Sequence, residues 1–164
     1  MLTRYWNAFA AKDVPAALAC FTDDISYEDL AVQQIHRGKD SVQAFWDLYF
    51  EAAGDSFNAV QESLVVDEDS YSFEWTVSGV IDGSFGIFTG QGQQFTIRGI
   101  STGVIRGELI AQNRDYWNLA DVLRQIERPG GSRARLARPR YSTDRLTRTK
   151  EADTCLTKNA TRGT

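Results

Sequence analysis

The spacing of apolar residues along the chain changes at Gly54. Before this glycine, residues 37–54 carry an apolar stripe at helical spacing. After it, apolar and polar residues alternate through 57–66, 71–81 and 94–117, which is typical of strands. Helices followed by antiparallel hairpins predict an α+β domain. The helical stripe consists of Val42, Phe45, Trp46, Tyr49 and Phe50.

Shorter patterns predict the remaining elements. Residues 5–13 and 13–21 are expected to form two short helices, the second capped by Asp13. Residues 25–30 alternate as a short strand does, whereas the glycine-rich segment 83–93 is expected to be a loop. Asn118 can cap a last short helix, which places the end of the folded domain at residue 127.

Charge divides the chain into residues 1–127 and 128–164. The second segment carries ten Lys or Arg and three Asp or Glu, a balance of +7, so the net charge of −4 leaves −11 for the first. The second segment also has few large aliphatic residues, and we expect a disordered, dispensable tail. A basic arm that binds a partner is the alternative. The acidic domain argues against nucleic acid as the main partner.

Other classes of protein are disfavoured by what the sequence lacks. No apolar run approaches the roughly 20 residues of a membrane helix, and residues 1–13 lack the apolar block of a signal peptide. A cytoplasmic protein is therefore expected. Cys20, Cys155 and the single histidine, His36, form no metal-ligand pattern, so we expect no bound metal.

Charged residues interrupt the strand pattern near its end, in the sequence "NRDYW" at 113–117. A two-residue turn at Arg106-Gly107 would place Arg98 opposite Asp115, with Ile100 opposite Asn113 on the same face. A bulge would shift this register by one residue and exchange the two faces.

If that face points into the domain, Asp115 can act as a general base. Arg98 would orient the carboxylate or stabilise an oxyanion. The alternative is a cross-strand ion pair that fixes the register. A catalytic aspartate should line a cavity of roughly 300 Å³ or more, whereas a structural one should be covered by aromatic rings. Nearby, "SYEDL" contains Tyr27, Glu28 and Asp29, and one of its two carboxylates either reaches the cavity mouth or, with the other, faces solvent.

Four segments together resemble one known family. They are "RYWNAFAAKDVPAALACFTDDISYED", "RGKDSVQAFW", "FEWTVSGVIDGSF" and "FTIRGISTGVIRGELIAQNRDYWN". Their order and spacing resemble the SnoaL-like branch of the nuclear transport factor 2-like superfamily over about residues 2–127. The resemblance implies a cone, in which a curved antiparallel sheet wraps three helices around an apolar pocket (a cystatin-like α+β barrel), and it implies a homodimer.

Relatives in this superfamily include polyketide cyclases, ketosteroid isomerase and limonene epoxide hydrolase, which act without cofactors. The resemblance thus implies an isomerase or cyclase for a polyketide, steroid or terpenoid-like compound, with Asp115 as base. A non-catalytic binding or dimerisation module is the alternative. Epoxide hydrolysis ranks below both, because Glu74-Trp75-Thr76 stands where the hydrolase has Arg-x-Asp. The residues expected to contact the ligand are Tyr5, Phe9, Tyr27, Trp46, Tyr49, Trp75, Ile100, Asn113 and Trp117.

Overall fold

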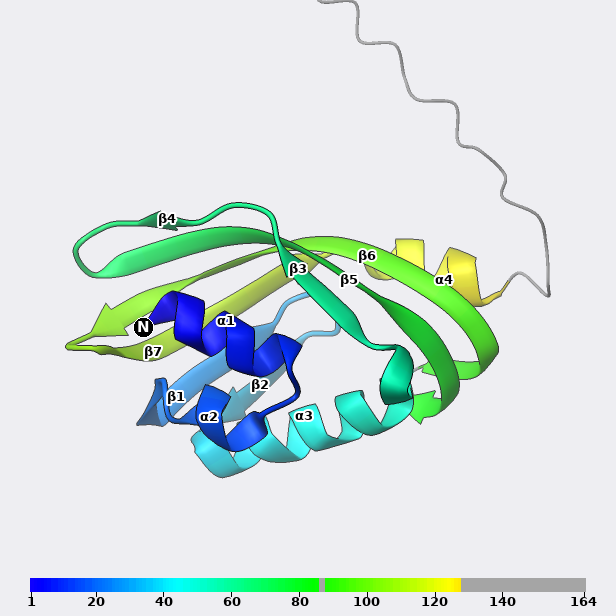
Figure 1. Ribbon diagram of the computed structural model, residues 1–164, viewed down its shortest axis with the longest axis horizontal. Coiled ribbons are helices and arrows are strands. Elements are labelled where there is room, and N and C mark those ends of the chain that lie inside the picture. The colour runs from blue at the N-terminus through cyan, green and yellow to red at the C-terminus, as the bar shows by residue number, and fades with distance from the viewer. Residues whose placement is uncertain (86–87, 128–164) are drawn as a thin grey trace, which may run out of the picture. The chain divides into compact units, whose positions relative to one another are not determined.

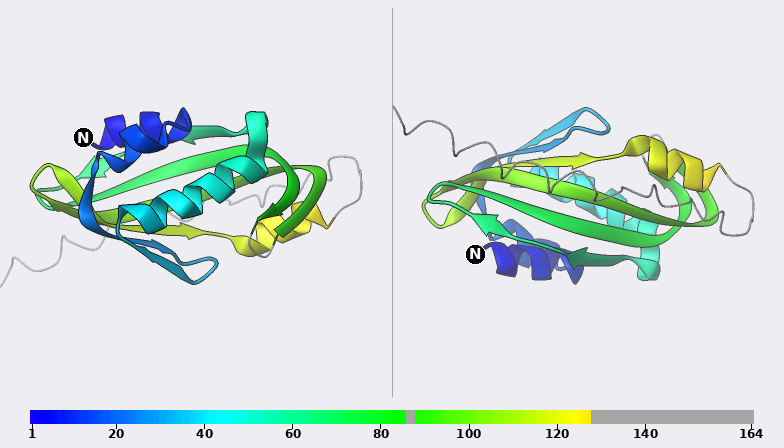
Figure 2. Two further views of the ribbon diagram at one scale, coloured as in Figure 1. Left: turned by 90° about the horizontal axis from the view of Figure 1, so that it is seen from below. Right: turned by 90° about the horizontal axis from the view of Figure 1, so that it is seen from above.

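A computed structural model describes residues 1–85 and 88–127 of the chain (Figure 1). The predicted tail, residues 128–164, and the prediction of its disorder lie outside the described residues. Within the described part the protein has the predicted mixed α+β architecture, in which helices pack against one strongly bent sheet (Figures 1 and 2).

The sheet has seven strands in the order β2-β1-β7-β6-β5-β3, with β4 paired to β5 outside this path. All neighbours are antiparallel except β1 and β7, which run parallel. The first and last strands of the path do not pair, so the sheet is curved but not closed. The strands are β1 (Phe21–Asp29), β2 (Gln34–Arg37), β3 (Asn58–Gln61), β4 (Val65–Val66), β5 (Ser70–Phe85), β6 (Phe88–Arg106) and β7 (Leu109–Trp117).

Helices α1 (Leu2–Ala10), α2 (Val14–Leu18) and α3 (Lys39–Ala53) lie on the concave side of the sheet (Figures 1 and 2). Two predicted helix ends are confirmed: Asp13 accepts a hydrogen bond from the Ala16 amide at 3.1 Å, and α3 ends at Gly54, whose φ is 53°. The expectation that Asp40 or Ser41 caps α3 is wrong, because the helix begins after Gly38 without a side-chain cap. A one-turn helix, η1 (Gly54–Ser56), leads into β3. The helices bring the apolar stripe of α3 and the aromatic residues of α1 against the sheet.

The pairing of β6 with β7 differs from the predicted register. The turn lies at Gly107-Glu108, because Arg106 pairs with Leu109, and a bulge in β7 follows, where Ala111 is the extra residue opposite Val104 and Ile105. Together these two changes place Ser101, rather than Arg98, opposite Asp115. A strand that is shifted along its neighbour by an odd number of residues turns its opposite face inward. Asn113 and Asp115 of β7 are buried, as predicted, so it is β6 whose predicted inner face is wrong.

The prediction of a loop over residues 83–93 is also wrong in the described residues. The ladder between β5 and β6 continues past Gly83, which pairs with Gly90, to Phe85 and Phe88. A bulge between Ile81 and Asp82 and the positive φ angles of Gly83 and Gly92 accommodate the bend. Glycine here permits the curvature of a long hairpin and does not end its strands.

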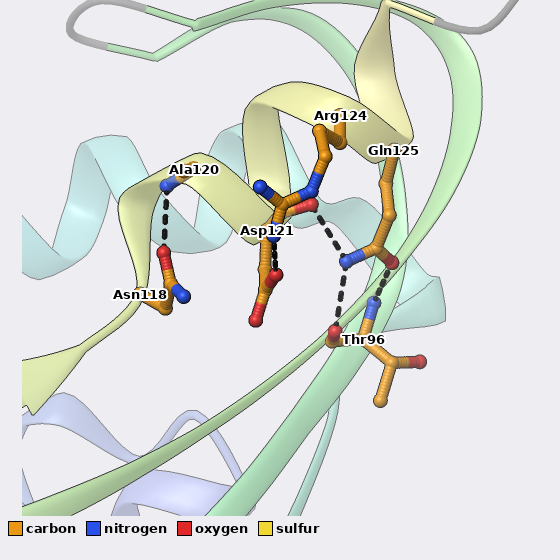
Figure 3. Close-up of polar contacts among 6 residues, drawn as sticks. All are labelled: Thr96, Asn118, Ala120, Asp121, Arg124 and Gln125. Carbon is orange, nitrogen blue, oxygen red and sulfur yellow. Dashed lines mark hydrogen bonds and ion pairs between the residues drawn. The ribbon is translucent and has the colours of Figure 1, made fainter. Parts of the chain in front are cut away.

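Helix α4 (Leu119–Ile126) completes the domain beside β6. Asn118 caps it as predicted, accepting from the Ala120 amide at 3.0 Å (Figure 3). Strand β7 ends opposite Gly99, and beyond that point the Gln125 side chain bonds the Thr96 backbone. Its oxygen accepts from Thr96 N–H at 2.8 Å, and its nitrogen donates to Thr96 C=O at 3.0 Å. One side chain thus satisfies backbone groups that the strand leaves unpaired.

The described helices include none that is long and apolar enough to cross a membrane.

Two isoleucines on β6 test the corrected register. Ile97 is buried and Ile100 is 41% exposed. Ile97→Ala should lower the free energy of unfolding by about 2 kcal/mol, because it removes a buried side chain, whereas Ile100→Ala should cost less than about 1 kcal/mol. Urea denaturation of the two variants measures the difference. A larger loss for Ile100→Ala would restore the register predicted from the sequence.

Candidate active site

A cavity of about 90 Å³ lies between the concave face of the sheet and helices α1, α3 and α4. Its wall is almost entirely apolar. The aromatic residues of the wall are Tyr5, Trp6, Phe9, Tyr27, Phe45, Trp46, Tyr49, Trp75, Phe95 and Trp117, and its polar residues are Asp29, Ser101 and Asp115.

The cavity is smaller than the roughly 300 Å³ expected for a ligand site. Its rings pack against one another and fill much of the cone. The ring centroid of Trp46, for example, lies 5.4 Å from that of Phe9, 5.6 Å from that of Phe21 and 5.7 Å from that of Tyr27. The size criterion set for a catalytic Asp115 is therefore not met for a whole ligand, and the cavity as it stands holds only a small group or one end of a larger molecule.

The cavity approaches the surface between α3 and the end of β7. Most of its lining residues are buried, but Phe45, Tyr49, Ala52 and Trp117 keep part of their surface exposed. These four residues are therefore the part of the wall that reaches the surface.

Asp115 is the polar centre of the cavity wall. It lies on β7 and is 9% exposed. Its Oδ1 accepts two hydrogen bonds, from Ser101 Oγ at 2.6 Å and from Asn113 Nδ2 at 2.8 Å. Its Oδ2 accepts one, from the Tyr27 hydroxyl. A carboxylate oxygen has two lone pairs, so Oδ2 retains one that no described residue uses.

A second carboxylate lies beside Asp115, because the parallel pairing of β1 with β7 makes Asp29 and Asp115 register partners. Asp29 is 6% exposed and also lines the cavity. Its Oδ1 accepts from Trp117 Nε1 at 2.9 Å and from the amides of Ala31 and Val32. These three donors hold the Asp29 carboxylate in place at the end of β1.

Burial dominates the ionisation of both carboxyl groups. It raises the pKa of Asp115 to about 6, against the opposing hydrogen bonds from Ser101, Tyr27 and Asn113, and the charge of Asp29 raises it further. Burial also raises the pKa of Asp29, with Trp117 and two backbone amides acting in the opposite direction. Burial and the Asp115 charge raise the pKa of Tyr27 well above its usual value, so this hydroxyl remains a donor.

Two residues that the sequence predicts in the site lie instead on the outer face of β6. Arg98 is exposed and pairs with Thr76 of β5 rather than with Asp115. Ile100 is 41% exposed and pairs with Tyr116. The turn and the bulge described above cause both errors. The predicted ion pair between Arg98 and Asp115 is therefore wrong, as is a role for Arg98 in the cavity.

The other predicted residues lie on the inner side. Asn113 is fully buried and does not line the cavity, but it donates to Asp115. Whether any of these residues contacts a ligand stays a prediction. Those that line the cavity together with Asp115 are Tyr5, Phe9, Tyr27, Trp46, Tyr49, Trp75 and Trp117.

The sequence left the placement of Asp29 open, and it did not assign Ser101 to the site. The signal for Asp29 was available, since it stands two residues after Tyr27 on a strand and so shares its face. Ser101 can be assigned to the site only once the turn and the bulge in the β6–β7 pair are known. His36, on β2, stacks on Phe45 with ring centroids 4.4 Å apart and stands outside the cavity wall. Residues 1–85 and 88–127 contain no group of three or more His, Cys, Asp or Glu arranged to hold a metal.

The sequence pattern of the SnoaL-like domain matches residues 2–113. The chain belongs to the SnoaL-like family. It is similar to Cyclase aurE of Calcarisporium arbuscula, with 28% identity over 107 residues that cover 65% of this chain and 75% of that protein. This agrees with the resemblance drawn from the sequence.

Solved structures share the fold of this SnoaL-like chain. A candidate polyketide cyclase from Pseudomonas putida is 25% identical, with a TM-score of 0.65 over 76% of this chain and 94% of that one. A hypothetical protein with a ketosteroid isomerase-like fold from Catenulispora acidiphila, solved with trimethylamine, is 20% identical. Its TM-score is 0.66 over 78% of this chain and 92% of its own. The second likeness supports the fold alone.

The raised pKa of Asp115 should appear in the pH dependence of stability. The folded pKa of about 6 lies above the usual value of 3.8, so the folded state binds the proton more tightly. The resulting stabilisation is complete below about pH 4 and is lost as the pH rises through about 6. Over this range Asp115 should lower the free energy of unfolding by up to about 3 kcal/mol, and Asp115→Asn should remove this contribution while that of Asp29 remains. Urea denaturation from pH 4 to pH 7 measures it, and equal slopes in the two proteins would contradict the assignment.

Proposed function

We propose that this SnoaL-like protein catalyses cofactor-free proton abstraction from an apolar carbonyl compound, leading to isomerisation or ring closure, with Asp115 as the general base. The observation that carries the proposal is a buried carboxylate in an aromatic cavity, with one oxygen occupied by two donors and, on the other, a lone pair that no described residue uses. A base with a pKa of about 6 is mostly ionised at neutral pH and can still return its proton.

In the proposed reaction Asp115 Oδ2 takes a proton from the carbon next to the ligand carbonyl. The electron pair of the broken C–H bond moves into the carbonyl, which becomes an enolate. For cyclisation, the enolate carbon attacks a second carbonyl of the same molecule and forms the new C–C bond. The protonated Asp115 then returns its proton to the resulting alkoxide, so that atoms and charge balance without a cofactor.

An enolate needs a hydrogen-bond donor, and Arg98 is not available for this role because it lies outside the cavity. The indole N–H of Trp46 is a better candidate. Trp46 lines the cavity and is 1% exposed, and its Nε1 has no hydrogen-bond partner among the described residues. A buried donor without a partner is costly, and a ligand oxygen would satisfy it. Trp46 therefore replaces Arg98 as the proposed oxyanion donor.

The size and shape of the cavity bear on the class of substrate. A fused-ring steroid needs more than about 90 Å³ unless the wall opens. A linear polyketide needs to insert only its reacting segment, which for ring closure includes the enolised carbonyl and the second carbonyl, while the rest of the chain lies along the half-buried rings of the wall. The relatives described as cyclases agree with this choice. We therefore favour a linear poly-carbonyl substrate.

Deuterium exchange tests the proposed base without knowledge of the natural substrate. Small ketones such as cyclohexanone in D₂O should lose their α-proton signals faster with the wild type, because Asp115 abstracts these protons. The rate should rise with pH through about 6, as the carboxylate ionises. Asp115→Asn should lower the enzyme-dependent rate by about 100-fold or more, the usual contribution of a general base. Proton NMR measures the exchange.

Glu28→Gln is the matched control, since Glu28 neighbours Asp29 on β1, is paired with Arg114 and does not line the cavity. It should exchange ketone protons at the wild-type rate. Ligand binding without turnover is the alternative function. Ketones that raise the melting temperature of the wild type but show no enzyme-dependent exchange at any pH would favour that alternative and overturn the proposed reaction.

A further inference from the structure

Two chains of hydrogen bonds reach Asp115 from strand β5. In the first, Trp75 Nε1 donates to Ser101 Oγ at 2.9 Å, and Ser101 donates to Asp115 Oδ1 at 2.6 Å. In the second, the Tyr71 hydroxyl donates to Asn113 Oδ1 at 2.6 Å, and Asn113 Nδ2 donates to the same Asp115 oxygen at 2.8 Å. Trp75 and Tyr71 are both buried and do not touch Asp115 through these bonds.

The direction of each chain is fixed by the chemistry of its first member. An indole N–H can only donate, so Ser101 must accept from Trp75 and turn its own proton toward Asp115. The Tyr71 hydroxyl, held as a donor by its raised pKa, fixes the Asn113 amide with its oxygen toward Tyr71. The NH₂ group of Asn113 then faces Asp115. Both chains therefore present donors to Oδ1, which favours the ionised carboxylate.

Two glycines in β6 make room for these chains. Gly99 pairs with Trp75 and Gly103 pairs with Tyr71 across the ladder from β5. A Cβ at residue 99 would lie 2.3 Å from the Trp75 ring, and one at residue 103 would lie 2.6 Å from the Tyr71 ring. The rings thus lie against the β6 backbone where a side chain would stand. Only with glycine at both positions do Trp75 and Tyr71 keep the observed placement.

We propose that Tyr71 and Trp75 are positioning residues for Asp115, which act through Asn113 and Ser101 to occupy Oδ1 and leave Oδ2 as the reactive oxygen. This inference rests on the proposed role of Asp115 as a base. It extends that role to two residues that do not contact the reacting atoms, and it explains why glycine stands at positions 99 and 103. Its consequence for ionisation can be measured without any substrate.

The test is an NMR titration of the Asp115 carboxyl carbon in protein labelled with ¹³C at Asp Cγ, with Asp115→Asn used to assign the signal. Tyr71→Phe keeps the ring and removes the hydroxyl that orients Asn113, so a donor to the ionised form weakens. The midpoint of the titration should move upward from its wild-type value by roughly half a pH unit or more. Trp75→Phe, which interrupts the other chain, should act in the same direction.

Tyr116→Phe is the matched control, because Tyr116 neighbours Asp115 on β7 but is 44% exposed. It should leave the midpoint unchanged. If Tyr71→Phe and Trp75→Phe lower the melting temperature while the midpoint stays at the wild-type value, both residues are structural only and the proposal is wrong. The titration uses no ketone, so its result remains separate from success or failure of the exchange experiment.

Discussion

Burial of the Asp115 carboxylate under aromatic rings is the constraint on which the rest of the structure depends. A charge removed from water costs several kcal/mol unless hydrogen bonds compensate. Three side-chain donors supply this compensation, and they come from three different strands: Tyr27 from β1, Ser101 from β6 and Asn113 from β7 itself. Burial still has the larger effect, which is why the pKa of Asp115 stays above its usual value.

The order of strands explains how such donors converge. Placing β7 between β1 and β6 brings residues that are 88 and 14 positions from Asp115 in the sequence into direct contact with it. The parallel pairing with β1 also places Asp29 level with Asp115, so two carboxyl groups share one apolar wall. The bulge in β7 sets which β6 residue meets Asp115. Small features of the sheet thereby decide the chemistry of the cavity.

Much of the fold follows from local patterns in the sequence. The change of period at Gly54, the caps at Asp13 and Asn118 and the inward face of β7 each depend on neighbouring residues, and the structure confirms them. The partner of Asp115 depends on the position of the turn and on a bulge in the β6–β7 pair, which together shift the register by three residues and exchange Arg98 for Ser101. The structural role of a glycine is also ambiguous in the sequence. Gly83 and Gly92 permit curvature, and Gly99 and Gly103 make room for rings from β5, a role visible only once the strands are paired.

A crystal structure of the protein with pentane-2,4-dione, a short 1,3-diketone, tests the central claim most directly. We predict that the diketone lies in the cavity with its central carbon within about 3.5 Å of Asp115 Oδ2, the spacing of groups ready to react, and with an oxygen toward Trp46 Nε1. A diketone at saturating concentration that lies only outside the cavity, or that meets Asp115 through Oδ1, would contradict the account.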